Sequence, residues 1–276
     1  MKTLIIALWI ILFIYLAYLL FNYIKYKLLI KQLSQIPFPK EYQQYLQKIP
    51  QYNALPKDLK LKIERSILLF LQTKNFIGIN INITDEMRVI ISFYACLLVI
   101  NKNECYDNLE YIYIYPHTII LDTIKNNGGI YSKELFLISG EAIGDGVVIA
   151  WDEAKKDIYH FKNKNLLIHE FTHELDLENG QADGIPILEK GKYYEWIDIL
   201  GKSYEEFQEK LINNKNLKKY KLIDKYGATN KAEFFAVLSE IFWSNPKLLK
   251  NHFPKIYKEF KNFFNFDPMI LYRKKS

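Results

Sequence analysis

The sequence contains little cysteine, glycine or proline, and each shortage excludes a class of protein. Only two of its 276 residues are cysteines, Cys96 and Cys105, too few for a disulfide scaffold. Its 11 glycines and 9 prolines exclude collagenous and low-complexity chains. Because half of the residues are apolar, the chain is not a disordered one. It has enough apolar residues for one well-filled core, or for a core and one membrane segment.

The chain also lacks any concentrated block of positive charge. Its net charge is +6, but the lysines are scattered among isoleucine, asparagine and tyrosine. Nucleic-acid-binding proteins group basic residues on one face, often with interleaved aromatic residues. We therefore predict that nucleic acid is not a partner.

Charged residues are missing altogether from Thr3 to Ile24. Crossing a hydrocarbon layer of about 30 Å takes roughly 20 helical residues, so this stretch is long enough. A signal peptide has a shorter apolar region, about 7–15 residues, followed by a small-residue cleavage site. This run ends in Phe21-Asn22-Tyr23 instead. We predict a retained transmembrane helix in contact with the lipid bilayer through residues 3–24, with a cleaved signal as the alternative.

The lysines that flank this segment predict its orientation. Only Lys2 precedes it, whereas Lys25, Lys27, Lys31 and Lys40 follow closely. Positive residues remain on the cytoplasmic side of a membrane, so the C-terminal part is expected to face the cytoplasm. The two lone thiols agree with a reducing compartment. The predicted location is the inner (cytoplasmic) membrane, crossed once.

Two prolines separate the anchor from the rest of the chain. Pro37 and Pro39 interrupt the helical pattern after the juxtamembrane stretch. We expect an anchor and juxtamembrane segment at residues 1–30 and one domain at residues 37–270.

Periodicity within this domain predicts an α+β fold. Apolar residues recur with helical spacing between Leu55 and Phe76. Thr84 and the two acids after it are typical of a helix start, and the run to Ile100 is apolar enough for a buried helix. Short strands are expected at Tyr111–Tyr115, Thr118–Leu121 and Val147–Trp151. After Asn165 the pattern is helical almost to the end, so the domain is mostly helical with a small β-sheet.

The strongest chemical signal is the pentapeptide His169-Glu170-Phe171-Thr172-His173. Residues four apart lie on one face of a helix, so both histidines face one point. Neutral imidazoles suit Zn²⁺, and Glu170 can accept a proton from a metal-bound water. The spacing predicts two histidine ligands and a general base. The alternative is a buried helix with hydrogen-bonded histidines, although burying unpaired polar groups is costly.

The third ligand has to come from another part of the chain. Glu195 lies near the distance that thermolysin-like enzymes use, but YYEWID departs from their motif. Glu233 opens a long apolar helix, where a carboxylate is out of place unless it is used. It also matches a capping box with Asn230. Glu240, seven residues later on nearly the same face, is a second candidate, either as the ligand or as a group that supports one.

Other features border the expected site. Asp176, one turn after His173, either orients a ligand histidine or forms a helix-end salt bridge. The strand that contains Val147 and Val148 is expected to lie at a sheet edge beside the cleft, where it can pair with an extended substrate. A turn is expected at Gly180, Asp183, Gly184 and Pro186.

Six stretches of the chain, taken in order, carry a family resemblance. They are ITDEMRVIISFYACLLVI, YIYIYPHTI, SGEAIGDGVVIAWD, LLIHEFTHELDLENGQADGIPIL, ATNKAEFFAVLSEIFW and NFDP. From about Leu55 to Pro268 the chain resembles the Mlc titration factor A family of bacterial zinc peptidases. Tyr-Gly followed by Thr-Asn-x-Ala-Glu-Phe-Phe is similar to the catalytic domain of anthrax lethal factor. The apolar run at the N-terminus is not part of the family's core pattern.

This resemblance implies a zincin-like, gluzincin-type metallopeptidase with one Zn²⁺ per chain. It implies that His169, His173 and Glu233 are the metal ligands and that Glu170 is the base. Tyr226 matches a tyrosine that assists the transition state; nothing in composition or spacing distinguishes it among 21 tyrosines. The resemblance implies hydrolysis of peptide bonds, with aminopeptidase-like activity in the family, and a transcriptional regulator as a partner.

A second function remains open at this point. The domain can instead be a zinc-containing binding module that sequesters a transcriptional regulator or another protein at the membrane. Glu170 disfavours this alternative, because a structural zinc site has no need of a base.

Overall fold

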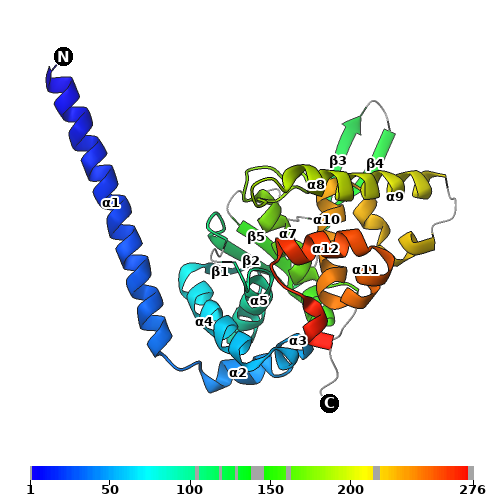
Figure 1. Cartoon of the computed structure of the whole chain (residues 1–276), viewed down its shortest axis with the longest axis horizontal. Helices are drawn as coiled ribbons and strands as arrows, with labels where there is room; N and C mark the ends of the chain where they lie inside the picture. The colour runs from blue at the N-terminus through cyan, green and yellow to red at the C-terminus, as the bar shows by residue number, and fades with distance from the viewer. Residues whose placement is uncertain are drawn as a thin grey trace. The chain divides into compact units, whose positions relative to one another are not determined.

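The computed structural model describes residues 2–102, 106–117, 120–127, 130–137, 146–159, 163–213 and 218–272, with the backbone alone for 120–127 and 130–137. The chain forms two compact units, Met1–Pro39 and Lys40–Ser276. Figure 1 shows the elements of both.

The first unit is one long helix, α1 (Lys2–Gln35). It contains an apolar stretch long enough to cross a membrane, and no residue of that stretch is buried within the protein. The large apolar side chains from Leu4 to Ile24 are exposed. A helix that is apolar all round needs an apolar environment. The first unit is therefore compatible with a single-pass membrane anchor.

The second unit is mostly helical. Its α-helices are α2 (Lys40–Leu46), α3 (Pro50–Ala54), α4 (Lys57–Thr73), α5 (Asp85–Leu98), α6 (Trp151–Ile158), α7 (Leu166–Leu177), α8 (Tyr193–Trp196), α9 (Lys202–Ile212), α10 (Lys231–Ser244), α11 (Pro246–His252) and α12 (Pro254–Phe263). Shorter helical turns are η1 (Ile197–Gly201), η2 (Lys218–Leu222), η3 (Lys225–Ala228) and η4 (Pro268–Tyr272). The predicted α+β class with a small sheet is confirmed.

A small parallel sheet crosses the unit. It consists of β1 (Asn75–Gly78), β2 (Tyr111–Tyr115) and β5 (Gly146–Ala150), in the order β1-β2-β5. In register, Phe76 pairs with Ile112, and Ile112 pairs with Val147. Two further strands, β3 (Ile120–Asn127) and β4 (Ile130–Leu137), form an antiparallel hairpin.

The structure corrects the ends of three predicted elements. The helix expected to continue to Phe76 ends at Thr73, because Asn75–Gly78 pairs with β2. Trp151 was expected to end a strand, but it begins α6. The strand expected to end at residue 121 continues to Asn127 as β3, and residues 118 and 119 of this prediction lie outside the described residues.

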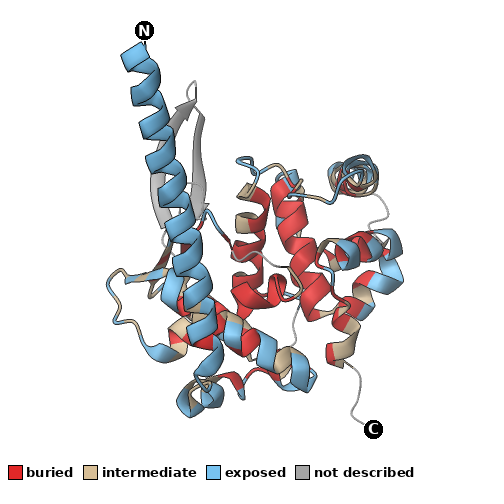
Figure 2. Ribbon diagram, turned by 60° about the vertical axis from the view of Figure 1, so that its left-hand side comes forward, coloured by how far each residue is buried: buried red, intermediate tan, exposed pale blue. Residues whose placement is uncertain are grey.

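The core of the second unit is built around α5, α7 and α10 (Figure 2). Side-chain caps fix where these helices begin: Thr84 accepts from the Met87 N–H, Asn165 from the Ile168 N–H, and Asn230 from the Glu233 N–H. The strands lie against α7 through β5, and α10 packs along α7.

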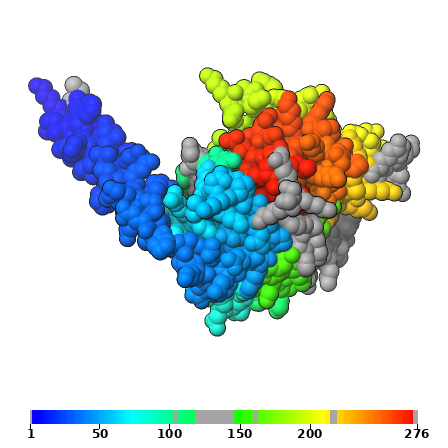
Figure 3. All heavy atoms as spheres, turned by 60° about the horizontal axis from the view of Figure 1, so that its bottom comes forward, coloured from blue at the N-terminus to red at the C-terminus, as the bar shows by residue number. Residues whose placement is uncertain are grey.

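The C-terminal end of the chain completes this unit. On the face shown in Figure 3, the helices around residues 50–70 lie beside the C-terminal segment. The contact is formed by α3 and η4. Tyr272 in η4 donates a hydrogen bond to the carbonyl of Trp243, at the end of α10. The C-terminal turn therefore covers the end of the helix that carries Glu233 and Glu240.

Candidate metal centre

Three predicted ligand residues lie together where α7 packs against α10. The Nε2 atoms of His169 and His173 are 3.1 Å apart. Glu233 Oε2 lies 3.0 Å from Nε2 of His169 and 3.5 Å from Nε2 of His173. One donor atom from each residue lies within 4.8 Å of the others. This group of atoms is small enough to surround one metal ion.

The positions of these side chains follow from helix geometry and helix capping, as the sequence predicts. The two histidines are one turn apart on α7, so their rings project from the same face. Glu233 lies in the first turn of α10, where its backbone N–H donates to the side chain of Asn230 at 2.9 Å. The capping interaction and the carboxylate's position near the histidines therefore exist together and are not alternatives.

Glu240 contacts His169 from the side away from this cluster. Its Oε1 lies 2.8 Å from Nδ1 of His169, and its Oε2 accepts from the backbone N–H of Asn165 at 2.6 Å. An ionised carboxylate can only accept, so Nδ1 of His169 carries a proton. In a neutral imidazole, Nε2 then carries the lone pair. Glu240 thus orients His169 and directs its lone pair toward His173 and Glu233.

The donor set fits a divalent metal ion. Two imidazole nitrogens and a carboxylate oxygen face one another, so a cation is needed between them, and a metal ion can take the place of the proton that His169 otherwise holds. Nitrogen and oxygen donors of this kind suit Zn²⁺, which in catalytic sites takes three protein ligands. Burial alone lowers the pKa of His169, but the carboxylates of Glu233 and Glu240 raise it well above its ordinary value. The cluster therefore carries an excess of negative charge that favours a bound cation.

Glu170 is buried beside the cluster, with 5% of its surface exposed. Its Oε2 atom accepts no hydrogen bond from any residue that the structure describes. Burial raises the pKa of its carboxyl, and the neighbouring histidines lower it. A buried carboxylate oxygen without a partner is uncommon and requires an explanation. Its chemistry is that of a proton acceptor close to the possible metal site.

Tyr226 reaches the same cluster from η3. Its hydroxyl donates to Oε1 of Glu233 at 3.3 Å, and its ring centroid lies 6.1 Å from that of His169. Asp224 caps this turn by accepting from the Tyr226 N–H at 3.0 Å, and it forms an ion pair with Lys164. Since 41% of Tyr226 is exposed, its hydroxyl can also meet a ligand that arrives from solvent.

The remaining predicted site residues lie at the periphery of the cluster. Asp176 accepts from the Gly184 N–H at 2.7 Å, and burial raises the pKa of its carboxyl to about 6. Its hydrogen bond is therefore to the loop after α7. Val147 and Val148 are buried in β5, at the end of the described three-stranded sheet and against α7. Glu195 pairs with Lys192 and is not part of the histidine cluster.

Two supporting residues were not anticipated from the sequence. The backbone N–H of Asn165 donates a hydrogen bond to Glu240. Lys164 forms an ion pair with Asp224, which caps the turn that contains Tyr226. Asn165 precedes the apolar run LLI, which is the usual signal for a helix cap. No signal in the sequence indicates the contact of Lys164 with Asp224, which is 60 residues away along the chain.

Comparison with known proteins gives consistent matches over most of the chain. The family described as "Glucose-regulated metallo-peptidase M90" matches residues 25–265. An uncharacterized protein of Synechocystis sp. is 32% identical over 248 residues, which cover 87% of this chain and 89% of that protein. Mlc titration factor A of Serratia proteamaculans is 32% identical over 204 residues, covering 72% and 77% of the two chains. The protein of the same name from Cronobacter sakazakii is 30% identical over 232 residues, covering 82% and 86%.

Proposed function

The chain belongs to the glucose-regulated metallo-peptidase M90 family, and on that premise we propose that it is a membrane-anchored, zinc-dependent peptidase. The resemblance to Mlc titration factor A predicted from its motifs is confirmed. Membership supports a metallopeptidase domain, and the cluster of His169, His173 and Glu233 is compatible with its metal ion. Zinc as the metal, the catalytic roles and the membrane location belong to this proposal.

The observation that carries the proposal is the arrangement of carboxylates around His169. Glu240 holds its Nδ1 atom, Glu233 faces its Nε2 atom, and Glu170 stays buried without a partner on one oxygen. Metal-assisted hydrolysis needs an oriented histidine ligand and a nearby carboxylate that can accept a proton. A purely structural zinc site does not need such a carboxylate.

We assign each residue of the site a separate role in peptide-bond hydrolysis. When bound by His169, His173 and Glu233, Zn²⁺ supplies Lewis acidity, which makes water more acidic and polarises a peptide carbonyl. Glu170 accepts the proton of the attacking water and passes it to the leaving amine. Tyr226 turns its hydroxyl from Glu233 to the developing oxyanion, a contact often worth about 3 kcal/mol. Val147 and Val148 in β5 pair with the extended substrate backbone.

The N-terminal apolar helix indicates where in the cell this activity takes place. The apolar helix α1 holds the protein in the inner membrane, and the lysines after the apolar run keep the peptidase unit in the cytoplasm. Peptide or protein substrates therefore belong to the cytoplasmic pool. Aminopeptidase activity is one form that the hydrolysis can take.

The proposed chemistry can be tested with the Glu170→Gln variant of the full-length protein, purified in detergent. The amide keeps the shape of the carboxylate but cannot take a proton, so Glu170→Gln should retain zinc and lose hydrolysis by several orders of magnitude. Near wild-type turnover in this variant shows that Glu170 is not the base.

A second candidate function is suggested by the name of the relatives. Mlc titration factor A implies the titration of a regulator, so the unit can act as a zinc-containing module that sequesters a transcriptional regulator at the membrane. The unpartnered oxygen of Glu170 favours the peptidase. Regulator binding that persists in Glu170→Gln, together with no hydrolysis by the wild type, favours the binding module.

A further inference from the structure

Two neighbouring residues before α7 support the metal cluster in different directions. The backbone N–H of Asn165 donates to Glu240 at 2.6 Å, and Glu240 in turn contacts Nδ1 of His169 at 2.8 Å. The ammonium group of Lys164 pairs with the carboxylate of Asp224, which lies directly before η3. One dipeptide is therefore linked both to a histidine of the cluster and to the turn η3.

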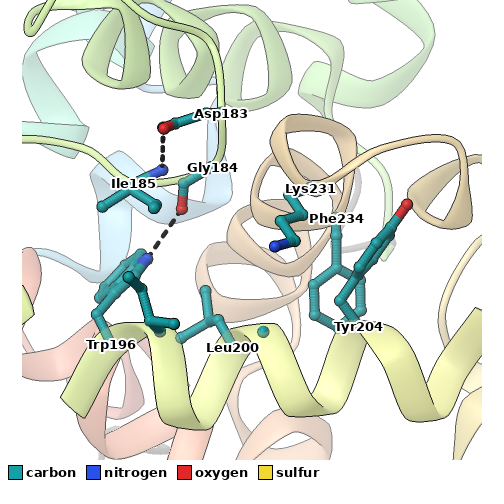
Figure 4. Close-up of a pocket in the computed structure, with 10 residues that line it drawn as sticks. Asp183, Gly184, Ile185, Trp196, Leu200, Tyr204, Lys231 and Phe234 are labelled. Carbon is teal, nitrogen blue, oxygen red and sulfur yellow. Dashed lines mark hydrogen bonds between the residues drawn. The ribbon is translucent and has the colours of Figure 1, made fainter. Parts of the chain in front are cut away.

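The C-terminal end of η3 is fixed by α9 and α10. The carbonyl of Ala228 accepts from Nε2 of Gln208 at 3.0 Å and from the hydroxyl of Tyr204 at 3.3 Å, both on α9. The ring of Tyr204 packs against Phe234 of α10, with the centroids 5.6 Å apart (Figure 4). Gly227, in the middle of the turn, is buried. This end of the turn is therefore held without any contribution from Lys164.

The N-terminal end of η3 is held through Asp224. Its Oδ1 accepts from the backbone N–H of Tyr226 at 3.0 Å, and its Oδ2 faces Nζ of Lys164. Burial raises the pKa of the Asp224 carboxyl, whereas Lys164 and the Tyr226 N–H lower it, and the net effect places this pKa below its ordinary value. The ionised carboxylate thus joins the backbone of Tyr226 to the ammonium group of Lys164.

The position of Tyr226 is important because its hydroxyl reaches the metal cluster. That hydroxyl donates to Oε1 of Glu233 at 3.3 Å, while 41% of the residue is exposed. Since its ring is only partly packed, the backbone of the turn has a large share in placing the hydroxyl. A displacement of about 1 Å in a catalytic group can cost about a hundredfold in rate.

We propose that Lys164 is a positioning residue: through Asp224 it fixes the start of η3 and so holds the hydroxyl of Tyr226 beside the metal cluster. This role rests on the peptidase function proposed above and deepens it, because Lys164 touches neither the possible metal ligands nor Tyr226 itself. The side chain of Lys164 is 68% exposed, so the ion pair contributes little to stability. Its effect is therefore expected in the rate of hydrolysis.

Three variants at neighbouring positions isolate this ion pair. Lys164→Met removes the ammonium group and keeps an unbranched apolar side chain, whereas Lys164→Arg restores the positive charge. Asn163→Ala is the matched control, because Asn163 is an exposed neighbour whose Oδ1 accepts from Nδ2 of Asn245 at 3.0 Å, at the end of α10. Thermal unfolding checks that all three variants fold.

The first experiment measures hydrolysis by the full-length protein in detergent, with a quenched fluorescent peptide that the wild type cleaves, chosen from a library. Lys164→Met should lower kcat by about two- to fivefold, the range expected from an exposed ion pair. KM should stay within about twofold, because the oxyanion contact of Tyr226 is made only in the transition state. Lys164→Arg and Asn163→Ala should retain the wild-type kcat.

A double-mutant cycle with Tyr226→Phe distinguishes positioning from a merely structural role. Without the hydroxyl there is nothing left to position, so Lys164→Met should cause no further loss of kcat in the Tyr226→Phe background. An equal loss in both backgrounds shows that Lys164 acts by another route and overturns the proposal. A loss of zinc affinity as large as the loss of kcat shows a general charge effect on the cluster and also overturns it.

Variants of Asp224 test the link between Lys164 and Tyr226. Asp224→Asn keeps an acceptor oxygen for the Tyr226 N–H but loses the charge, so its kcat should match that of Lys164→Met. Asp224→Ala removes the cap as well and should lower kcat by about tenfold. Wild-type kcat in a folded Asp224→Ala protein overturns the proposal.

Hydrogen exchange separates this proposal from the peptidase function, because it needs no hydrolysis. Mass spectrometry of the full-length protein follows the backbone amides of η3, which should exchange about two- to fivefold faster in Lys164→Met and at the wild-type rate in Asn163→Ala. Faster exchange supports the role of Lys164 in holding the turn, even if the wild type cleaves no peptide and the peptidase function fails. Unchanged exchange in Lys164→Met overturns the proposal, and cleavage by the wild type then leaves the peptidase function standing.

Discussion

Replacing Glu240 with glutamine should weaken zinc binding without destroying the site. Glu240 is 6% exposed and accepts from Nδ1 of His169 and from the Asn165 N–H. Glutamine has one acceptor oxygen, so its NH₂ group must face one of these two donors. Either choice leaves a buried donor without an acceptor and weakens the orientation of His169.

The size of the loss follows from this geometry. Replacement of a group that orients a metal-binding histidine typically costs 10- to 100-fold in affinity. This corresponds to about 1.4–2.8 kcal/mol, since each 1.4 kcal/mol is a factor of ten. Glu233→Ala removes a donor atom itself and should weaken zinc binding far more. The spacing of these two acids on one helical face leaves open which is the ligand, whereas their contacts with His169 distinguish them.

Competition with a chromophoric chelator measures these affinities in purified protein. Glu259→Gln is the matched control, because Glu259 is a buried acid on α12 outside the histidine cluster. It should leave zinc affinity unchanged, and thermal unfolding should show that all three variants are folded. Equal losses for Glu240→Gln and Glu233→Ala, or a larger loss at Glu240, would refute the assignment of roles.

Three further predictions concern catalysis, folding and topology. Tyr226→Phe removes the hydroxyl that we propose assists the oxyanion, so kcat should fall about a hundredfold while zinc affinity stays within a few-fold; an unchanged kcat in steady-state assays contradicts this role. Asn230→Ala removes the cap of α10 and should lower the free energy of unfolding by about 1 kcal/mol, measured by denaturant titration; no loss of stability argues against the cap. A reporter that works only in the cytoplasm, fused after Ser276, should be active, and one that works only outside should be silent. The reverse pattern contradicts the predicted orientation.

Much of the site could be predicted because its signals are local. The histidines and Glu170 lie within one helical turn, so their relation follows from helix geometry alone. The cap at Asn165 is equally local. The choice between Glu233 and Glu240 could not be made from spacing, because both project from one face of α10. It depends on how α10 packs against α7, which is a tertiary contact.

The features that the sequence did not reveal depend on distant parts of the chain. Asn75–Gly78 continues the periodicity of α4, and its strand conformation is set by pairing with β2, more than 30 residues later. Lys164 is one of many lysines, and only the folded chain shows that it holds the turn of Tyr226. Asp176 was expected either to orient a histidine or to form a salt bridge, and its contact with Gly184 depends on the path of the following loop.

Zinc stoichiometry in the wild type and in His173→Ala tests the central claim most directly. His173 lies one turn from His169 and 3.5 Å from Glu233, and it offers one of the three donor atoms of the possible metal site. Elemental analysis of purified full-length protein should give about one zinc per chain in the wild type and a substoichiometric amount in His173→Ala, with the variant still folded by thermal unfolding. One zinc per chain in a folded His173→Ala protein would contradict the proposed metal centre.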